Sequence, residues 1–184
     1  FSACCGVYAR VDLDPDSLAP ERLSPGTTNV DFGPSMRAML GRVRPRSELA
    51  LRVGAEAVAL AEQDSRIFAA VGAHPHEAAE LTDQTRVQIS KWLDHERVVA
   101  VGECGLDYYR TDPESKQKQT DNFRKQIQLA NETNTPLMLH VRKSDDPNVP
   151  SAYLDVAEIL KAEAKVPFNF HFFAGTIEEA QALL

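Results

Sequence analysis

The sequence has 184 residues, of which 43% are hydrophobic and 26% are charged. These values are typical of a globular protein and exclude disorder along the whole chain. With 20 basic and 27 acidic side chains the formal net charge is -7, so the surface as a whole does not attract nucleic acid or anionic membranes. No apolar run approaches the ~20 residues of a membrane-spanning helix.

The three cysteines, Cys4, Cys5 and Cys104, indicate a reducing compartment, because so small and odd a number builds no disulfide framework. We expect plain thiols and a cytoplasmic protein, or a nuclear one if the source is a eukaryote. The sequence begins at Phe1 and not at methionine, so we expect the natural N-terminus to lie further upstream. We infer no obligate protein partner.

Residues 1–47 are expected to form turns and loops, with one short strand within "FSACCGVYARVDL". This segment holds five of the 11 prolines, which are spaced too closely for a long helix to form between them. From residue 48 the pattern becomes regular. We expect a single domain of strands and helices over residues 48–184.

Helices are predicted where apolar residues recur at helical spacing. They cover residues 47–63, 80–95, 113–132 and 153–165, and a further helix begins after Thr176. The N-cap candidates of the first, second and last of these helices are Ser47, Thr82 and Thr176. The residues expected to face inward in the second and third of these helices are Val87, Ile89, Trp92, Leu93, Phe123, Ile127 and Ala130.

Short apolar runs between the helices predict strands at 66–72, 97–102, 135–141 and 166–172. These strands start 31 to 39 residues apart, which is the length of a strand, a crossover helix and a return strand. Their nearly continuous apolar character is typical of strands covered on both faces. The sequence therefore predicts an α/β protein with a parallel sheet.

Each predicted strand ends at a side chain that can bind a metal ion. His74 and His76 follow the first strand and Glu103 follows the second, whereas His140 and His171 lie at the C-terminal ends of the third and fourth. Because parallel strands place their C-terminal ends on one side of a domain, we expect these side chains to lie together. Buried ionisable groups cost several kcal/mol unless they are paired or bind a cation. The pattern predicts a site for a divalent ion, Mg²⁺, Mn²⁺ or Zn²⁺.

Each of these residues also has a structural explanation. A single histidine at the end of a strand is more often a hydrogen-bonded residue at the rim than a metal ligand. Glu103 could cap a helix or pair with Arg110, and Arg142 and Lys143 could belong to a solvated turn. Two histidines and one carboxylate also bind iron in non-haem oxygenases, but the alternation of strands and helices does not suit the all-β barrels typical of those enzymes.

A closed barrel would bring these ligands together better than an open sheet. Neighbouring strands of an open sheet lie ~4.8 Å apart, so ligands on consecutive strands spread along a line. The first strand is followed by "VGAHPHEA" and not by the glycine fingerprint of a nucleotide-binding sheet. We expect a (β/α)8 TIM barrel that is incomplete in this chain, because that fold usually takes ~250 residues and the sequence stops at Leu184 within a predicted helix.

Four stretches resemble, in their order and spacing, the signatures of the TatD family of metal-dependent deoxyribonucleases: "VGAHPHEA", "VGECGLDYYR", "LMLHVRK" and "FHFFAGTIEEA". The resemblance runs from about residue 53 to 184 and implies a TIM-barrel hydrolase with one or two divalent metal ions. By this resemblance Glu103 is similar to the carboxylate that bridges two metals. His140 and His171 are similar to the imidazole ligands of one of them.

The resemblance also implies roles on the substrate side. His74 or His76 is similar to the residues that touch the substrate phosphate, and Arg142 matches a position near the phosphate-binding rim. Asp107 matches the aspartate of the glutamate motif, for which a role in orienting the loop is implied. The family's HxH pair has no counterpart here, since no histidine precedes His74. The general base is unknown, because the family's late aspartate would lie beyond Leu184.

The function implied by the resemblance is a deoxyribonuclease that cleaves phosphodiester bonds at DNA ends with metal-activated water. The acidic net charge agrees with contacts to a strand end better than with binding to a long duplex. One alternative is a hydrolase of another ester or amide bond on the same barrel, because the fold does not choose between these reactions. Another is a degenerate barrel that binds metal without catalysis, which the absent HxH pair motivates.

Overall fold

The computed structural model describes residues 7–9, 49–109 and 112–184. Within these residues, strands form one sheet in the order β1-β2-β3-β4-β5. The strands are β1 Val7–Ala9, β2 Ile67–Val71, β3 Val98–Asp107, β4 Leu137–Arg142 and β5 Phe168–Phe170. Strands β2 to β5 are parallel and β1 is antiparallel to β2. The predicted α/β architecture with a parallel sheet is confirmed.

Helices lie before, between and after the parallel strands. They are α2 Leu49–Gln63, the 3-10 helix η4 Pro75–Glu80, α3 Asp83–Leu93, α4 Pro113–Thr133, α5 Ala152–Glu163 and α6 Ile177–Ala182. Thr82 and Thr176 cap α3 and α6 as predicted, each by accepting a backbone N–H bond. Among the described helices, none combines the length and the apolar character that a membrane crossing requires.

The predicted opening strand coincides with β1, but the rest of the proline-rich segment 1–47 lies outside the described residues. The N-cap candidate Ser47 and the alternative partner of Glu103, Arg110, also lie outside them. The 3-10 helix η4, which carries His76, was not predicted from the sequence.

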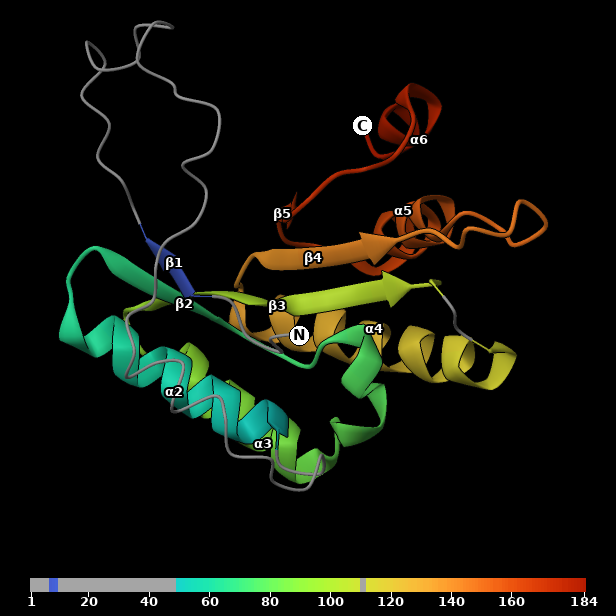
Figure 1. Cartoon of the computed structure of the whole chain (residues 1–184). Coiled ribbons are helices and arrows are strands. Elements are labelled where there is room, and N and C mark those ends of the chain that lie inside the picture. Colours follow the sequence, from blue (N-terminus) through green and yellow to red (C-terminus); the bar gives the residue numbers. More distant parts are fainter. Residues whose placement is uncertain (1–6, 10–48, 110–111) are drawn as a thin grey trace, which may run out of the picture.

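One part of the core lies between strands β3 and β4 and helices α4 and α5. In β4, Leu137, Leu139 and Val141 are buried on this side. Because strand side chains alternate, His140 and Arg142 lie on the opposite face of the sheet. Figure 1 shows β3 and β4 side by side and pointing in one direction, with α4 behind them. The site residues of β4 therefore stand on the face turned away from these helices.

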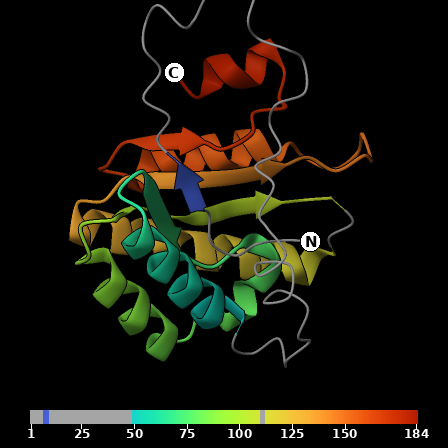
Figure 2. The ribbon, with the colours of Figure 1, turned by 60° about the vertical axis from the view of Figure 1, so that its left-hand side comes forward.

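A second part of the core joins α2 and α3 to β2, and Figure 2 shows the two helices side by side. Ile89 is buried there, and Trp92 and Leu93 pack against the cluster. The prediction that Val87 faces inward is wrong, because its side chain is 55% exposed. Val87 lies two positions before Ile89, which is more than half a turn around the helix.

Strand β3 does not end before Glu103, as the sequence predicted, but continues to Asp107. The pairing with β4 passes from Gly102 directly to Cys104, so Glu103 stands in a β-bulge. A bulge inserts one extra residue and moves the following side chains to the opposite faces of the sheet. Gly105, at φ 137, continues this stretch in a conformation that favours glycine.

The bulge decides which residues of β3 are core residues. Val101 belongs to the core before it, and Cys104 and Leu106 belong to the same core after it. Glu103, which precedes Cys104, and Asp107, which follows Leu106, therefore lie on the face that carries His140.

Helix α4 holds the ends of β2 and β3 through two buried glutamines. Gln126 accepts the Ala73 N–H and donates to the Ala73 C=O, both at 2.8 Å. Gln119 makes the same pair of bonds with the backbone of Asp107, at 2.8 and 3.0 Å. The glutamines are seven positions apart, which places them on one face of the helix two turns from each other. They satisfy backbone groups at the points where the chain leaves the sheet.

Gln126→Leu should lower the free energy of unfolding by about 1–3 kcal/mol, because the N–H and C=O of Ala73 would stay buried without this partner. Urea denaturation followed by circular dichroism measures the loss. Gln128→Leu is the matched control, since Gln128 is exposed on the same helix. Equal stability of the two variants would contradict a stabilising role for the bonds between Gln126 and Ala73.

Candidate metal centre

Glu103 lies between two imidazoles from neighbouring strands. Its Oε2 is 3.8 Å from Nδ1 of His140, and its Oε1 is 3.6 Å from Nε2 of His171. His140 is part of β4, and His171 follows β5, where its N–H donates to the Leu139 C=O at 3.0 Å. The fold thus brings together all three residues that the sequence predicts as metal ligands, and each carboxylate oxygen faces a different histidine.

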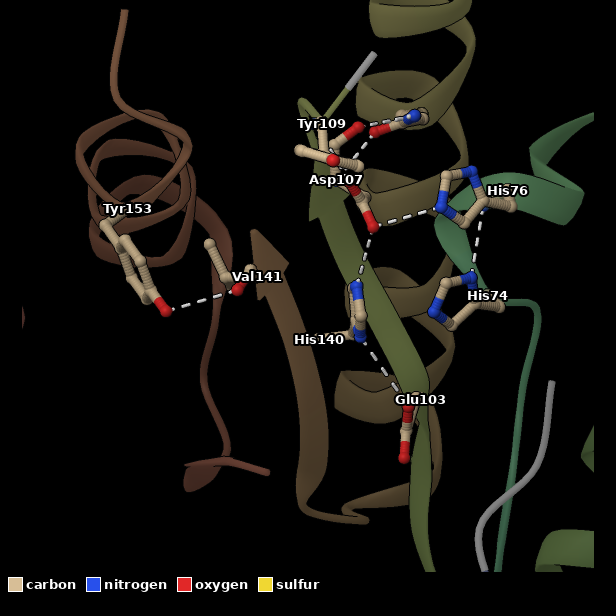
Figure 3. A network of polar contacts seen from close by, with 9 residues as sticks. His74, His76, Glu103, Asp107, Tyr109, His140, Val141 and Tyr153 are labelled. Carbon is tan, nitrogen blue, oxygen red and sulfur yellow. Dashed lines mark hydrogen bonds and ion pairs between the residues drawn. The ribbon is translucent and has the colours of Figure 1, made fainter. Parts of the chain in front are cut away.

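A fourth side chain, His74, joins this cluster from the loop after β2. One ligand atom each from His74, Glu103 and His140 lies within 4.8 Å of the other two. The ring centroids of His74 and His140 are 4.3 Å apart. His74 is buried, whereas Glu103 and His140 are partly buried. Figure 3 shows the three side chains converging from β3, β4 and the loop that leads into η4.

The donor set fits a divalent cation. Atoms bound tetrahedrally at ~2.1 Å from a zinc ion lie roughly 3.4 Å from one another, close to the separations around Glu103. Nε2 of His140 is 3.0 Å from a carboxylate oxygen of Asp107. When Nε2 carries the proton, the neutral ring directs the lone pair of Nδ1 toward the Glu103 carboxylate. Two electron-rich atoms then face each other, which is the arrangement that a cation stabilises.

Asp107 is the polar centre of the site (Figure 3). Its Oδ2 bonds to Nε2 of His76 and to Nε2 of His140, both at 3.0 Å, and its Oδ1 accepts the Tyr109 N–H at 2.9 Å. Burial alone would raise the pKa of the Asp107 carboxyl. The bonds from His140 and Tyr109 and the charges of the two histidines outweigh it and hold the pKa below its usual value. Asp107 is therefore an ionised acceptor. Its bonds to His76 and His140 reach beyond the loop that the family resemblance implies it orients.

His74 differs from His76 and His140 in its hydrogen bonds. Burial, with repulsion from His140 and His76, lowers the pKa of His74 to about 3, so its ring is neutral at pH 7. Nδ1 of His74 accepts the His76 N–H at 3.2 Å. The proton of the neutral ring therefore sits on Nε2, which makes that atom a donor. Although His74 is close enough to share an ion, this tautomer favours a contact with an anionic oxygen.

The remaining predicted residues lie at the rim. The His76 side chain is 45% exposed, and the Arg142 guanidinium stacks on Tyr109 with its Cζ 3.6 Å from the ring centroid. Lys143 instead pairs with Glu179, at 3.2 Å between Nζ and Oε2. Arg142 is thus held by an aromatic ring on the site side, whereas Lys143 belongs to a structural ion pair.

The stability of the protein should depend on pH through His74. Its folded pKa of about 3 lies below the ~6.5 of an unfolded histidine, so the unfolded state binds more protons between these values. The contribution of His74 to the free energy of unfolding is fully present above about pH 6.5 and is lost as the pH drops toward 3. The amide oxygen of His74→Asn can still accept the His76 N–H. In this variant the free energy of unfolding should change less steeply with pH, by up to about 1.4 kcal/mol per pH unit. Urea denaturation across this window tests it, and equal slopes would contradict a buried neutral His74.

The chain is similar to known proteins over most of its length. The family model described as TatD related DNase matches residues 43–184. An uncharacterized metal-dependent hydrolase of Bacillus subtilis, YabD, is 37% identical over 127 residues, which are 68% of this chain and 46% of that protein. The 3'-5' ssDNA/RNA exonuclease TatD of Escherichia coli K12 is 32% identical over 137 residues, which are 72% of this chain and 48% of that protein.

Solved structures show the same fold. The TatD homolog YJJV of Escherichia coli K12 superimposes with a TM-score of 0.61 at 30% identity, covering 70% of this chain and 48% of that one. An uncharacterized amidohydrolase of Saccharomyces cerevisiae, at 19% identity and a TM-score of 0.52, supports the fold alone. The described strands correspond to part of a (β/α)8 barrel, as the sequence predicted.

The chain spans about half the length of the curated relatives it matches. The family model covers most of this sequence, including every residue of the candidate metal centre. The chain therefore belongs to the family of TatD-related DNases.

Proposed function

We propose that this chain carries the metal-binding part of a nuclease that hydrolyses phosphodiester bonds at the ends of nucleic acid strands, with DNA as the expected substrate. The observation that carries the proposal is the position of Glu103, whose two oxygens face imidazoles of two neighbouring strands at 3.6 and 3.8 Å. The name of the Escherichia coli relative, a 3'-5' ssDNA/RNA exonuclease, supports strand ends as the substrate.

In this proposal Glu103, His140 and His171 hold the divalent ion. Nδ1 of His140 and Nε2 of His171 would supply lone pairs to it, and the carboxylate of Glu103, which faces both, would supply negative charge. A bound ion of this kind lowers the pKa of a coordinated water and offsets the charge that develops on the phosphoryl oxygens. The partial burial of Glu103 strengthens its attraction to a cation by excluding some of the water around it.

The substrate side is proposed to consist of His74, His76 and Arg142. The Nε2–H of His74 can donate to a phosphate oxygen from within the site. The guanidinium of Arg142 offers several donors to a phosphate, and its stacking on Tyr109 limits the rotamers that it would lose on binding. These groups provide local attraction for an anion in a protein whose net charge is -7.

We also propose that residues 48–184 act as one unit and that the protein works in the cytoplasm, or in the nucleus if the source is a eukaryote. Cys104 supports a reducing compartment, because it is buried as a free thiol within the described part of the chain. Burial raises the pKa of this thiol, so it packs as an apolar group.

Glu103→Gln and His140→Ala should each lower the Mn²⁺-dependent release of nucleotides from single-stranded DNA by at least about 100-fold. Each change removes a proposed ligand, which costs more than the loss of a ligand's hydrogen-bond partner. Glu96→Gln is the control, because its side chain is 85% exposed and stands outside the site. Wild-type rates in either site variant would reject the assignment of that residue as a metal ligand. Cleavage of a panel of esters or amides in place of DNA would favour the alternative function, a hydrolase of another ester or amide bond.

Metal binding should be visible without catalysis. At a free Mn²⁺ concentration of about 100 times its Kd, the metal should stabilise the chelator-treated protein by about 2.7 kcal/mol. Thermal unfolding with and without Mn²⁺ measures this shift in the wild type. Glu103→Gln should lose most of it, whereas the same shift in both proteins would place the ion elsewhere.

A further inference from the structure

We propose that Asp107 is the positioning residue of this site: through a single carboxylate oxygen it fixes which nitrogen of His140 faces Glu103 and where His76 stands at the rim. The inference rests on the proposed function only for the metal that His140 would bind. The hydrogen-bond geometry stands without it.

The first step is the chemistry of the acceptor. An ionised carboxylate accepts hydrogen bonds and donates none, so both imidazole atoms that contact Oδ2 of Asp107 must carry protons. For His140 this places a proton on Nε2, 3.0 Å from Asp107, and leaves Nδ1, 3.8 Å from Oε2 of Glu103, as the atom that would bind a metal ion. Metal-bound histidines commonly donate their other ring N–H to a carboxylate in this way.

The second step is the rigidity of the carboxylate itself. The Asp107 side chain is only 2% exposed. Its backbone N–H and C=O are both bonded to Gln119, and its Oδ1 accepts the Tyr109 N–H. Rotation of the carboxylate would break the Tyr109 bond together with a histidine bond. Asp107 therefore presents Oδ2 to the two imidazoles in one orientation.

The third step is the link between the two sides of the site. His76 and His140 come from different elements, η4 and β4, and share one oxygen atom. The residue whose N–H binds the other oxygen, Tyr109, carries the guanidinium of Arg142 on its ring. A change at Asp107 should therefore alter both the metal-facing and the rim-facing groups.

Asp107→Asn is a diagnostic change because it replaces one acceptor oxygen with a donor. With the amide oxygen kept on the Tyr109 N–H, the new NH2 group points at both imidazole Nε2 atoms. His140 must then accept at Nε2 and carry its proton on Nδ1. That proton faces Glu103 and occupies the atom proposed to bind metal.

The wild-type protein provides the first test. Two-bond ¹H–¹⁵N correlation spectra of the metal-free, histidine-labelled full chain show which ring nitrogen carries the proton, and His140→Ala assigns the signal. The neutral ring of His140 should carry its proton on Nε2. A proton on Nδ1 would overturn the proposal, whether or not any variant at Asp107 folds.

The variant provides the second test. Asp107→Asn should move the His140 proton to Nδ1 and weaken Mn²⁺ binding, measured by calorimetry, by about 10- to 100-fold. Asp155→Asn is the matched control, because Asp155 accepts a bond from the neighbouring Tyr108 hydroxyl at 2.8 Å and takes no part in the site. An unchanged tautomer and unchanged affinity in Asp107→Asn would overturn the proposal.

These tests distinguish a failure of the proposed function from a failure of the proposed role of Asp107. A wild-type protein that binds Mn²⁺ with the expected His140 tautomer and cleaves no nucleic acid rejects the nuclease and supports the role of Asp107. A protein that binds no Mn²⁺ rejects the metal centre, and the tautomer measurement still decides whether Asp107 fixes His140.

Discussion

The candidate metal centre depends on the bulge at Glu103. From Val101 onward, strict alternation along β3 would turn Glu103 and Asp107 into the apolar layer under α4 and α5, where an unpaired carboxylate costs several kcal/mol. The extra residue shifts the alternation, so Cys104 and Leu106 fill the core instead. One local irregularity in a strand thus supplies both carboxylates of the site.

Helix α4 gives this arrangement its rigidity. Its inward face carries glutamines, because the backbone around Ala73 and Asp107 leaves the sheet with polar groups that neighbouring strands do not satisfy. Each glutamine amide offers one donor and one acceptor, which matches one peptide N–H and one C=O. Ala73 directly precedes His74, and Asp107 bonds to His140, so the same helix fixes the proposed substrate side and the proposed metal side. Fold stability and site geometry therefore share these bonds.

The sequence predicted the elements well where apolar periodicity was strong, as in the four parallel strands and in the caps at Thr82 and Thr176. It misplaced Val87, because the angle around α3 that faces the core depends on how α3 packs against its neighbours. The bulge did leave a signal. Two positions, one of them a glycine, separate the core residues Val101 and Cys104, and an isolated glycine in a strand is a known sign of a bulge.

The residues able to bind a metal, and their places on consecutive strands, follow from the sequence alone, because parallel strands put their C-terminal ends on one side. The role proposed for Asp107 does not follow from the sequence. Its bonds to His76 and His140 join residues more than thirty positions away, and nothing in the local pattern specifies such a contact. Only the tertiary structure decided which nitrogen each histidine presents, because a tautomer is set by the partner across the site.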